Sequence, residues 1–477
     1  MVLSRAIIRA VLKRVLNKFL EKCKVRIKSL LILMMAMPIT VFAVAPVQEF
    51  KLNNGLKLIV QEDHRSPVVV SQVWYRAGSI DEVNGKTGVA HLLEHMMFKG
   101  TKTVPAGQFS RIVAAAGGKE NAFTSSDYTC YFQQLEKSHL PLIFKLEADR
   151  MANLNLTKKE FAKEIKVVME ERRWRTDDKP QAMVNEAFQG AVYRAHPYAR
   201  PVVGFMNDLE NMTDEDAREW YRQWYAPNNA TVVVVGDIKA QEVYQLAQQY
   251  FGKLKAKVLP ARKPQVEPAQ IGERRVVVKA PAKQAYLLMG YHVPALVDAA
   301  NDWEPYALEV LAGVLSGNPS ARLNQKLVRE TQLAVDVSAG YDILSRGRLS
   351  LFELDGTPSE GKTVLELEAA LLQQIEKIKD AGVSTEELDR VKAGVIAADV
   401  YQRDSMFYQA MQIGTVESIG FSWKILEDYP AKLRAVTAEQ VQAVAKKYLL
   451  QDNLTIATLD PQPIDPKAQP KGKPHVH

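Results

Sequence analysis

Short apolar runs alternate with segments of helical periodicity from about residue 48 onward. Apolar or alternating runs of four to eight residues are typical of strands, whereas apolar residues three or four positions apart are typical of helices. We expect strands at 56–63, 68–78, 121–135 and 231–237, and helices at 87–99, 106–118, 138–152 and 157–176. The pattern therefore indicates a chain of mixed α and β structure.

The pattern starts again after a Pro-rich stretch. Residues 257–271 (KVLPARKPQVEPAQI) have the composition of a linker. Two expected strands, RRVVVKA and AYLLMGYHVP, follow, and a helix near 303–316 then occupies the place of the helix at 87–99. Thr213 and Thr437 each open a helix that leads into a strand at a matching offset. These parallels indicate an internal duplication with a period of about 224 residues.

The N-terminal segment has the features of a targeting sequence. A basic stretch ends at Lys28, and residues 29–45 form an uncharged run with small-residue cleavage signals at its end. We expect a signal peptide or membrane anchor, and hence a periplasmic, secreted or membrane-anchored protein. The expected segments are 1–45 (leader), 46–256 (first domain), 257–272 (linker), 273–462 (second domain) and 463–477 (disordered tail).

The positive net charge belongs to the N-terminal segment. Residues 1–28 contain nine Lys or Arg and one acid, a net charge of +8, so the rest carries −1 of the total of +7. Proteins that bind nucleic acid usually present an excess of basic residues to the phosphates. A nucleic-acid partner is therefore not expected.

A metal-binding motif occurs in the expected helix at 87–99. His91-Leu92-Leu93-Glu94-His95 places two imidazoles at positions i and i+4, which lie on one face of a helix. This is the histidine helix of a zinc hydrolase in the inverted order H-x-x-E-H. Thr87 is in position to cap the start of the helix. A catalytic zinc site needs one more protein ligand.

The third ligand is expected on another element that faces this helix. The segment FAKEIKVVMEERRWRTDD at 161–178 is the richest in acids. Glu164 and Glu171 are seven residues apart and share one helix face, whereas Glu170 points elsewhere. Chemistry alone does not choose between Glu164 and Glu171.

The residues quoted so far resemble those of the pitrilysin/insulinase family of zinc peptidases, which includes the mitochondrial processing peptidases. In that family a ligand Glu follows H-x-x-E-H after about 76 residues, in a pattern that Glu164, Val167, Val168 and Glu171 match. The resemblance implies an α+β fold of two duplicated domains, each an antiparallel-rich sheet packed with helices. It also implies one Zn²⁺ per chain, with Glu171 as the third ligand and Glu164 as the nearby acid of the catalytic site.

The family resemblance also implies a reaction. We expect a zinc-dependent endopeptidase that hydrolyses peptides or unfolded segments inside a two-part chamber, with zinc-bound water activated by Glu94. The matching residues Asn121, Ala122 and Phe123 imply an edge strand that binds substrate. The alternative is a non-catalytic structural or partner subunit of a larger assembly, but such family members have broken metal motifs.

One departure from the family pattern concerns a substrate-holding pair in the second domain. Active members carry an Arg followed seven residues later by a Tyr. Here Arg329 is present, but Val335 or Asp336 falls where the Tyr is expected. We therefore expect a homodimer, or a heterodimer with a related chain that supplies the Arg/Tyr pair.

Overall fold

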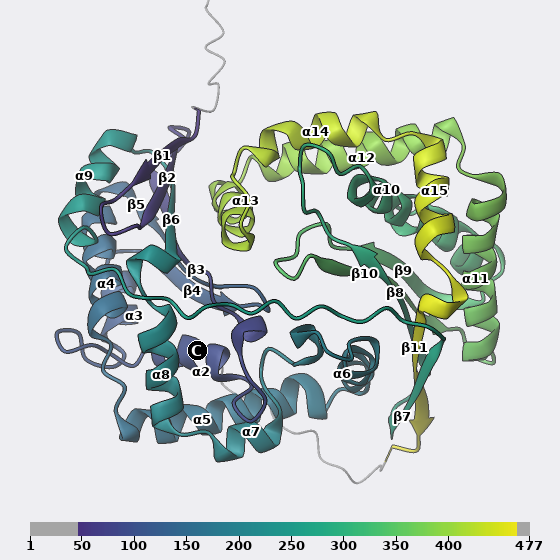
Figure 1. Ribbon diagram of the computed structural model, residues 1–477, viewed down its shortest axis with the longest axis horizontal. Helices are drawn as coiled ribbons and strands as arrows, with labels where there is room; N and C mark the ends of the chain where they lie inside the picture. Colours follow the sequence, from purple (N-terminus) through teal and green to yellow (C-terminus); the bar gives the residue numbers. More distant parts are fainter. Residues whose placement is uncertain (1–45, 465–477) are drawn as a thin grey trace, which may run out of the picture. The chain divides into compact units, whose positions relative to one another are not determined.

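Two mixed β-sheets organise residues 46–464, the part of the chain that the computed structural model describes (Figure 1). The first contains β1 (Gln48–Lys51), β2 (Lys57–Glu62), β3 (Val68–Tyr75), β4 (Lys119–Thr124), β5 (Thr129–Glu136) and β6 (Ala230–Gly236). The second contains β7 (Arg274–Pro281), β8 (Tyr286–Pro294), β9 (Ala334–Tyr341), β10 (Leu349–Pro358) and β11 (Leu454–Gln462).

The two sheets repeat one topology. The strand order is β1-β2-β6-β3-β5-β4 in the first sheet and β7-β11-β8-β10-β9 in the second. Strand β2 pairs in parallel with β6 and β7 pairs in parallel with β11, whereas the other pairings are antiparallel. Without β1 the two orders are identical, so the α+β class and the duplication expected from the sequence are confirmed.

Helices cover one face of each sheet. The first sheet packs on α2 (Val89–Met96), α3 (Gln108–Ala115), α4 (Leu140–Asn153), α8 (Asp214–Trp224) and α9 (Ala240–Tyr250), with α5 (Lys158–Arg172) and α7 (Met206–Asn211) outside α2. The second packs on α10 (Glu304–Ser316), α11 (Val364–Ala381) and α15 (Ala438–Tyr448), with α12 (Thr385–Gln402) and α14 (Ile425–Ala435) against α10. Each layer buries its own apolar core.

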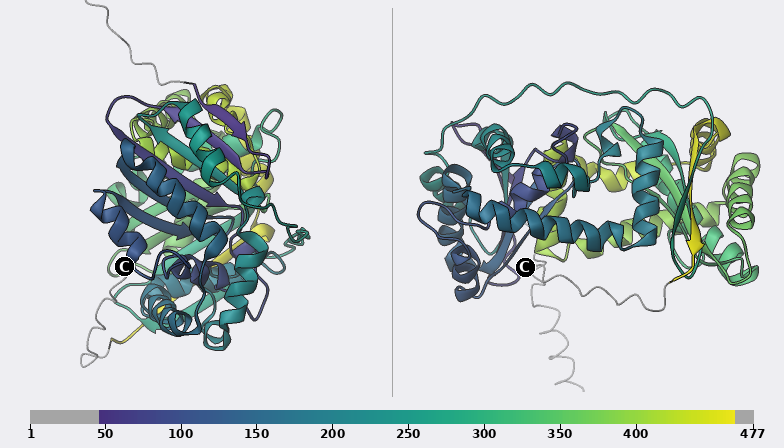
Figure 2. Two further views of the ribbon diagram at one scale, coloured as in Figure 1. Left: turned by 90° about the vertical axis from the view of Figure 1, so that its left-hand side faces the viewer. Right: turned by 90° about the horizontal axis from the view of Figure 1, so that it is seen from below.

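The opposite face of each sheet is covered by a helix from the other half of the chain. Helix α6 (Pro180–Val192) packs on β7, β8 and β11, and α13 (Met406–Ile419) packs on β3 and β6 (Figures 1 and 2). On α6, Phe188 lies against Gly290 of β8, and on α13, Gly414 lies against Trp74 of β3. The halves therefore hold each other through exchanged helices.

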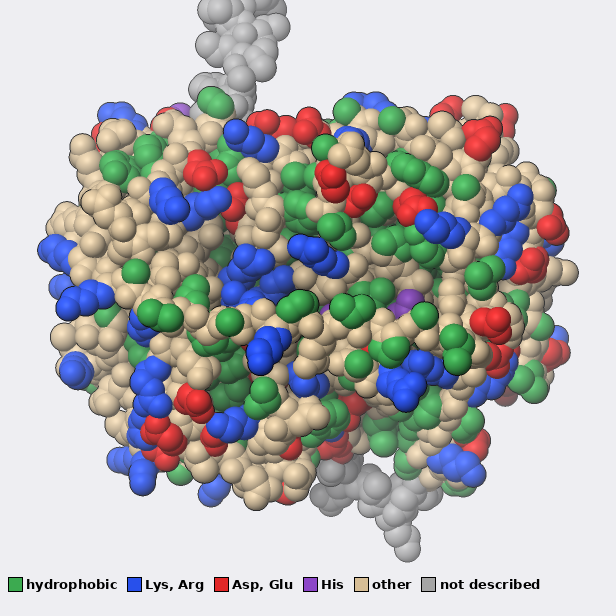
Figure 3. Space-filling model, in the orientation of Figure 1, with side chains coloured by type: hydrophobic (Ala, Val, Ile, Leu, Met, Phe, Trp, Pro, Cys, Tyr) green, Lys and Arg blue, Asp and Glu red, His purple; other side chains and the backbone are tan. Residues whose placement is uncertain are grey.

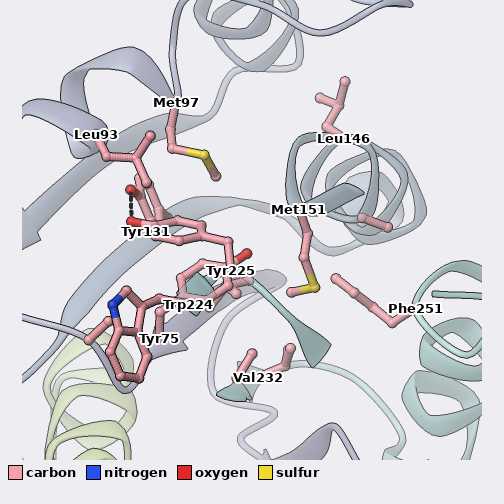
Figure 4. Close-up of a cluster of buried hydrophobic side chains, with 14 of the residues drawn as sticks. Tyr75, Leu93, Met97, Tyr131, Leu146, Met151, Trp224, Tyr225, Val232 and Phe251 are labelled. Atoms are coloured by element: carbon pink, nitrogen blue, oxygen red, sulfur yellow. Dashed lines mark hydrogen bonds between the residues drawn. The ribbon is translucent and has the colours of Figure 1, made fainter. Parts of the chain in front are cut away.

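The core of the first half lies directly against α2 (Figure 4). Tyr75 stacks on Tyr225 at 4.1 Å between ring centroids, and the hydroxyl groups of Tyr131 and Tyr225 lie 2.7 Å apart. Leu93 and Met97 cover these rings from the helix side. Burying one large apolar side chain stabilises a fold by roughly 1.5–3 kcal/mol. This packing fixes the position of α2, the helix that carries both His residues.

Two local expectations were wrong. The stretch 121–135 is not one strand but the hairpin of β4 and β5, because the Ser125 hydroxyl oxygen accepts hydrogen bonds from the backbone N–H groups of Asp127 and Tyr128 and forms a turn. Thr87 does not cap α2, since its hydroxyl donates to Asp208 instead. By contrast, Thr213 and Thr437 cap α8 and α15 as expected.

The expected leader at 1–45 and most of the expected tail at 463–477 lie outside the described residues. Within residues 46–464, no helix has the length and apolar character needed to cross a membrane.

Candidate metal centre

Helix α2 presents His91 and His95 on one face because most of its other positions are apolar. Val89, Leu92, Leu93 and Met96 are buried in the core, and this fixes the rotation of the helix. The two imidazole rings lie 4.8 Å apart between centroids. His91 is 7 % exposed, so its environment is nearly free of bulk water.

The start of α2 is held by a carboxylate that is distant from the helix motif. Glu82 accepts hydrogen bonds from the backbone N–H groups of Gly88 and Ala90, both at 2.9 Å. Burial raises the pKa of Glu82 to about 8, against the effect of these two N–H groups. Gly88 has φ +88°, and a Cβ there would lie 2.5 Å from the carbonyl oxygen of Val203. The turn before the motif therefore requires glycine.

Glu171 reaches the two imidazoles from α5. Its Oε1 pairs with Arg175 at 2.8 Å, and its Oε2 lies 3.2 Å from His95 Nε2 and 3.7 Å from His91 Nε2. One ligand atom from each of His91, His95 and Glu171 lies within 4.8 Å of the other two. The structure thus brings together the two His of the motif and the Glu that the family resemblance selected.

The donor set of this cluster fits a divalent cation. Glu171 is 1 % exposed, and its Oε2 makes no hydrogen bond of good geometry with the described residues. Its neighbours are the two imidazole Nε2 atoms, so a cation between the carboxylate and the two rings would satisfy this buried oxygen. Two imidazoles and one carboxylate, with room for a water, are the ligand types of catalytic zinc sites.

The two imidazoles differ in their affinity for a proton. Burial, together with the neighbouring His95, lowers the pKa of His91 to about 3. Burial also lowers the pKa of His95, but the carboxylates of Glu164 and Glu171 outweigh it and raise the pKa to about 9. Neutral imidazole is the form that binds metal, so a cation at the cluster would displace the proton that these carboxylates attract to His95.

Glu164 lies behind His95 rather than among the ligand atoms. Its Oε2 is 3.4 Å from His95 Nδ1, and its Oε1 pairs with Lys99 at 2.7 Å. Histidine ligands of metals usually donate their second ring N–H to such a carboxylate, which fixes the tautomer and the ring orientation. Both Glu candidates on α5 therefore meet His95, one at each ring nitrogen.

Glu94 lies next to the cluster and beside strand β4. Thr124, the last residue of β4, donates its hydroxyl to Glu94 Oε2 at 2.5 Å. Burial raises the pKa of Glu94, and the hydrogen bond from Thr124 opposes that shift. A carboxylate whose pKa is shifted toward neutrality is suited to proton transfer.

The expected substrate-binding residues fall at two separate places. Asn121, Ala122 and Phe123 lie on β4, the edge strand of the first sheet, which contacts α2. Arg329 is exposed on a π-helical turn (Asn324–Glu330) in the second half. Among the described residues, no hydrogen bond or ion pair joins Arg329 to the metal cluster. The structure thus brings β4 to the centre but not Arg329.

Sequence reasoning missed several residues around the centre. Arg175 follows Glu171 by one helical turn, and that spacing could have identified it. Glu82, Lys99 and Thr124 reach the site through the fold, and their local sequence carries no signal.

Comparisons with known proteins identify the family of the chain. The insulinase model (peptidase family M16) matches residues 57–205, and the model of the peptidase M16 inactive domain matches residues 211–395. The zinc protease PqqE of Helicobacter pylori is 37 % identical over 346 residues, which cover 72 % of this chain and 76 % of that protein.

Solved structures show the same fold. The crystal structure of a protease from Helicobacter pylori has a TM-score of 0.82 and 32 % identity, and the match covers 87 % of this chain and all of that one. The periplasmic protease PqqL of Escherichia coli has a TM-score of 0.74 at 19 % identity, and the match covers 91 % of this chain but 52 % of that one. The chain therefore belongs to the insulinase family of zinc peptidases, peptidase family M16.

Proposed function

We propose that the chain is a zinc-dependent endopeptidase that cleaves peptides or unfolded segments, with His91, His95 and Glu171 as the zinc ligands. The observation that carries this proposal is the convergence of the three ligand atoms within 4.8 Å, with Glu94 alongside. Membership of a family of zinc peptidases supports the same assignment. The first half, 46–256, is then the peptidase domain, and 273–462 is its inactive repeat.

Glu94 is the proposed general base. When bound, zinc lowers the pKa of a water toward about 7 and polarises the scissile carbonyl group. Glu94 accepts the proton of the attacking water and passes it to the leaving amine. The hydroxyl of Thr124 donates to one carboxylate oxygen of Glu94, which leaves the other oxygen to accept the proton.

Glu164 acts through His95 in this proposal. A carboxylate on His95 Nδ1 favours the tautomer in which Nε2 is the metal ligand. Lys99 neutralises the other oxygen of Glu164 and holds it in place. We therefore assign Glu164 a positioning role, not a direct part in proton transfer.

Substrate is proposed to bind along β4. This strand is the last of its sheet, so its outer edge can pair with an extended peptide. The backbone N–H of Ala122 donates to the Asn121 side chain at 2.9 Å, and that side chain would move aside when a peptide binds. Asn121, Ala122 and Phe123 would form the added ladder, and Thr124 continues the strand to Glu94. Recognition through the backbone predicts broad sequence tolerance and selection for unfolded segments.

A second chain is proposed to complete the substrate chamber. Val335, one of the two residues where the family has Tyr, is 54 % exposed on β9. The chain also matches about half of the periplasmic protease PqqL. A homodimer, or a heterodimer with a chain that supplies the Arg/Tyr pair, would provide both halves of such a chamber. A location outside the cytoplasm is proposed from the sequence at 1–45.

Zinc content and peptide cleavage test the proposal together. We expect about one zinc per chain, and cleavage of a quenched unstructured peptide that stops with chelator and returns with zinc. A chain that binds zinc but does not cleave, alone or with its partner, would instead support the alternative of a non-catalytic subunit. A chain that cleaves equally well after complete zinc removal would contradict the proposed mechanism.

A further inference from the structure

A cavity of about 550 Å³ lies on the face of the first sheet that packs against α13. It is lined by the β1–β2 hairpin, the ends of β3 and α13, the start of β6, and residues 259 and 262 of the linker. Val70 and Trp74 of β3 point to this face, whereas Val69 and Val73 point to the α2 side. The cavity is therefore separated from the metal centre by the sheet.

The charged lining of this cavity is predominantly basic. Lys51, Lys57, Arg76 and Arg262 line it, against two acids, Glu49 and Glu417. Figure 3 shows Lys and Arg side chains gathered near the middle of the visible face.

Most of these charges are paired within the protein. Lys57 pairs with Glu49 at 3.3 Å and with Glu417 at 2.8 Å. Arg262 and Arg346 share the buried carboxylate of Asp81, and both also donate to the backbone carbonyl oxygen of Arg76. Glu49, Glu417 and Asp81 are thus already in ion pairs. Their partners are Lys57, Arg262 and Arg346.

The guanidinium of Arg76 has no such partner among the described residues. Its Nε is buried, and none of its side-chain nitrogens has a hydrogen bond or ion pair within residues 46–464. Burial lowers the pKa of Arg76, as do the neighbouring positive charges of Arg262 and Arg346, and these effects outweigh the opposite effect of Asp81 and Asp127. The C-terminal end of α13 lies beside it at Gly420, where helix carbonyl dipoles favour a cation. The fold therefore keeps an electropositive donor without giving it an acceptor.

Lys51 adds a second unexplained charge. It lies directly opposite Lys57 in the β1–β2 ladder, and like charges in that arrangement destabilise a hairpin. Lys51 is exposed and has no ion pair within the described part of the chain. Lys57 has its own two carboxylate partners, whereas an anion in the cavity would supply the partner that Lys51 and Arg76 lack.

We propose that this cavity binds a small oxyanion, a phosphate or carboxylate group, through the Arg76 guanidinium with help from Lys51. A planar guanidinium presents paired N–H donors that match the oxygens of either group. The volume of the cavity accommodates such a group together with several waters. Asn229, Ser418 and Ser422 also line it and add polar side chains.

Calorimetric titration of the zinc-loaded full chain tests the site. The ligands are inorganic phosphate and a short peptide with a free carboxyl terminus, the latter compared with its amide. We expect saturable binding of phosphate, of the free peptide acid, or of both. Arg76→Gln should weaken that binding by about 10-fold to 100-fold, the range for hydrogen bonds to a charged group. Arg111→Gln, which removes an exposed guanidinium from α3, should leave it unchanged.

Three results would overturn the proposal. They are the absence of phosphate and free-acid binding to the wild type, equal binding by the Arg76→Gln variant, and equal loss in the Arg111→Gln variant. Phosphate held at the metal centre would show as binding that is insensitive to Arg76→Gln. If Arg76→Gln does not fold, Lys51→Gln on the exposed hairpin takes its place, and there an undiminished affinity contradicts the proposal.

Discussion

Helices α2 and α10 occupy matching places in the two halves, yet only α2 carries the residues of a metal centre. Each follows the same strand of a repeated sheet topology. In α10 the buried positions are apolar or aromatic apart from Glu309, there is no His, and the helix packs on β9, α12, α14 and α15. In α2 two His and one Glu face α5 and β4 instead. The fold is thus maintained by apolar patterning, and the site depends on a few side chains added to it.

The exchanged helices differ in a similar way. On the first sheet the large residue is on the strand and the small one is on the helix, as Trp74 and Gly414. On the second sheet the order is reversed, with Gly290 on the strand and Phe188 on the helix. In both sheets one large and one small residue fill the space between strand and helix. The large residue can therefore come from either element.

The largest effect is expected from replacing Glu94 of α2, and little effect on cleavage is expected from replacing Glu309 of α10. Glu94→Gln should lower peptide cleavage by about 10²-fold to 10⁴-fold and retain zinc, because it removes the general base but not a ligand. Glu309→Gln on α10 is the matched control, since Gln can still accept the hydrogen bond from Tyr429. Cleavage rates and zinc content of both variants provide the measurement. Normal cleavage by the Glu94→Gln variant would refute the role of Glu94.

The next largest effect is expected from replacing Glu164, the carboxylate that holds His95 in place. Glu164→Gln removes the carboxylate from His95 Nδ1 and leaves Lys99 without its partner. Zinc affinity should fall by about 10-fold to 100-fold, as for other residues that orient metal ligands. Competition with a fluorescent chelator measures this change, and Glu170→Gln on the exposed side of α5 is the control. Equal affinities for the Glu164→Gln and wild-type proteins would mean that Glu164 does not support the site.

The exchanged helices should be sensitive to added volume. A Cβ on Gly414 would lie 2.0 Å from Trp74 Cε2, so Gly414→Ala should destabilise the fold by about 1–3 kcal/mol or more. Gly290→Ala should cost less, because its Cβ meets the far end of the Phe188 ring. Gly394→Ala in α12 meets no atom within 4 Å and should stabilise by about 0.5–1 kcal/mol. Denaturant unfolding ranks the variants, and a Gly414→Ala variant as stable as the Gly394→Ala variant would contradict this packing.

The smallest expected effect concerns Glu309, the buried acid of α10. Burial raises the pKa of Glu309 to about 7, although Tyr429 donates to it. The folded protein then holds this proton more tightly than the unfolded chain, so the stability that it contributes is full below about pH 4.5 and is lost as the pH rises through 7. The wild type should therefore lose stability relative to the Glu309→Gln variant between pH 5 and pH 8. A pH-independent difference would show that Glu309 is not protonated near neutrality.

The sequence predicted the parts of the centre that are local. The H-x-x-E-H spacing places His91 and His95 on one face of any helix, and the family spacing selects Glu171. The apolar runs likewise predicted both strands of each parallel pair. The metal cluster could be anticipated because its ligands come from two helices with clear periodicity.

The features that the sequence did not predict depend on contacts between distant segments of the chain. Glu82 reaches the N–H groups of α2 only after the intervening turn has folded. The β4–β5 turn lies inside a run of alternating apolar and polar residues. Periodicity alone therefore predicted one strand where the structure has two. Helices α6 and α13 each cover the sheet of the other half of the chain, and nothing in their local sequence specifies that partner.

Anomalous diffraction at the zinc edge, from crystals of the zinc-loaded protein, tests the central claim most directly. The account predicts one strong peak per chain, between the imidazoles of His91 and His95 and the carboxylate of Glu171, and no peak beside α10. A zinc position that excludes any of these three side chains, or a second site in the repeat, would contradict it.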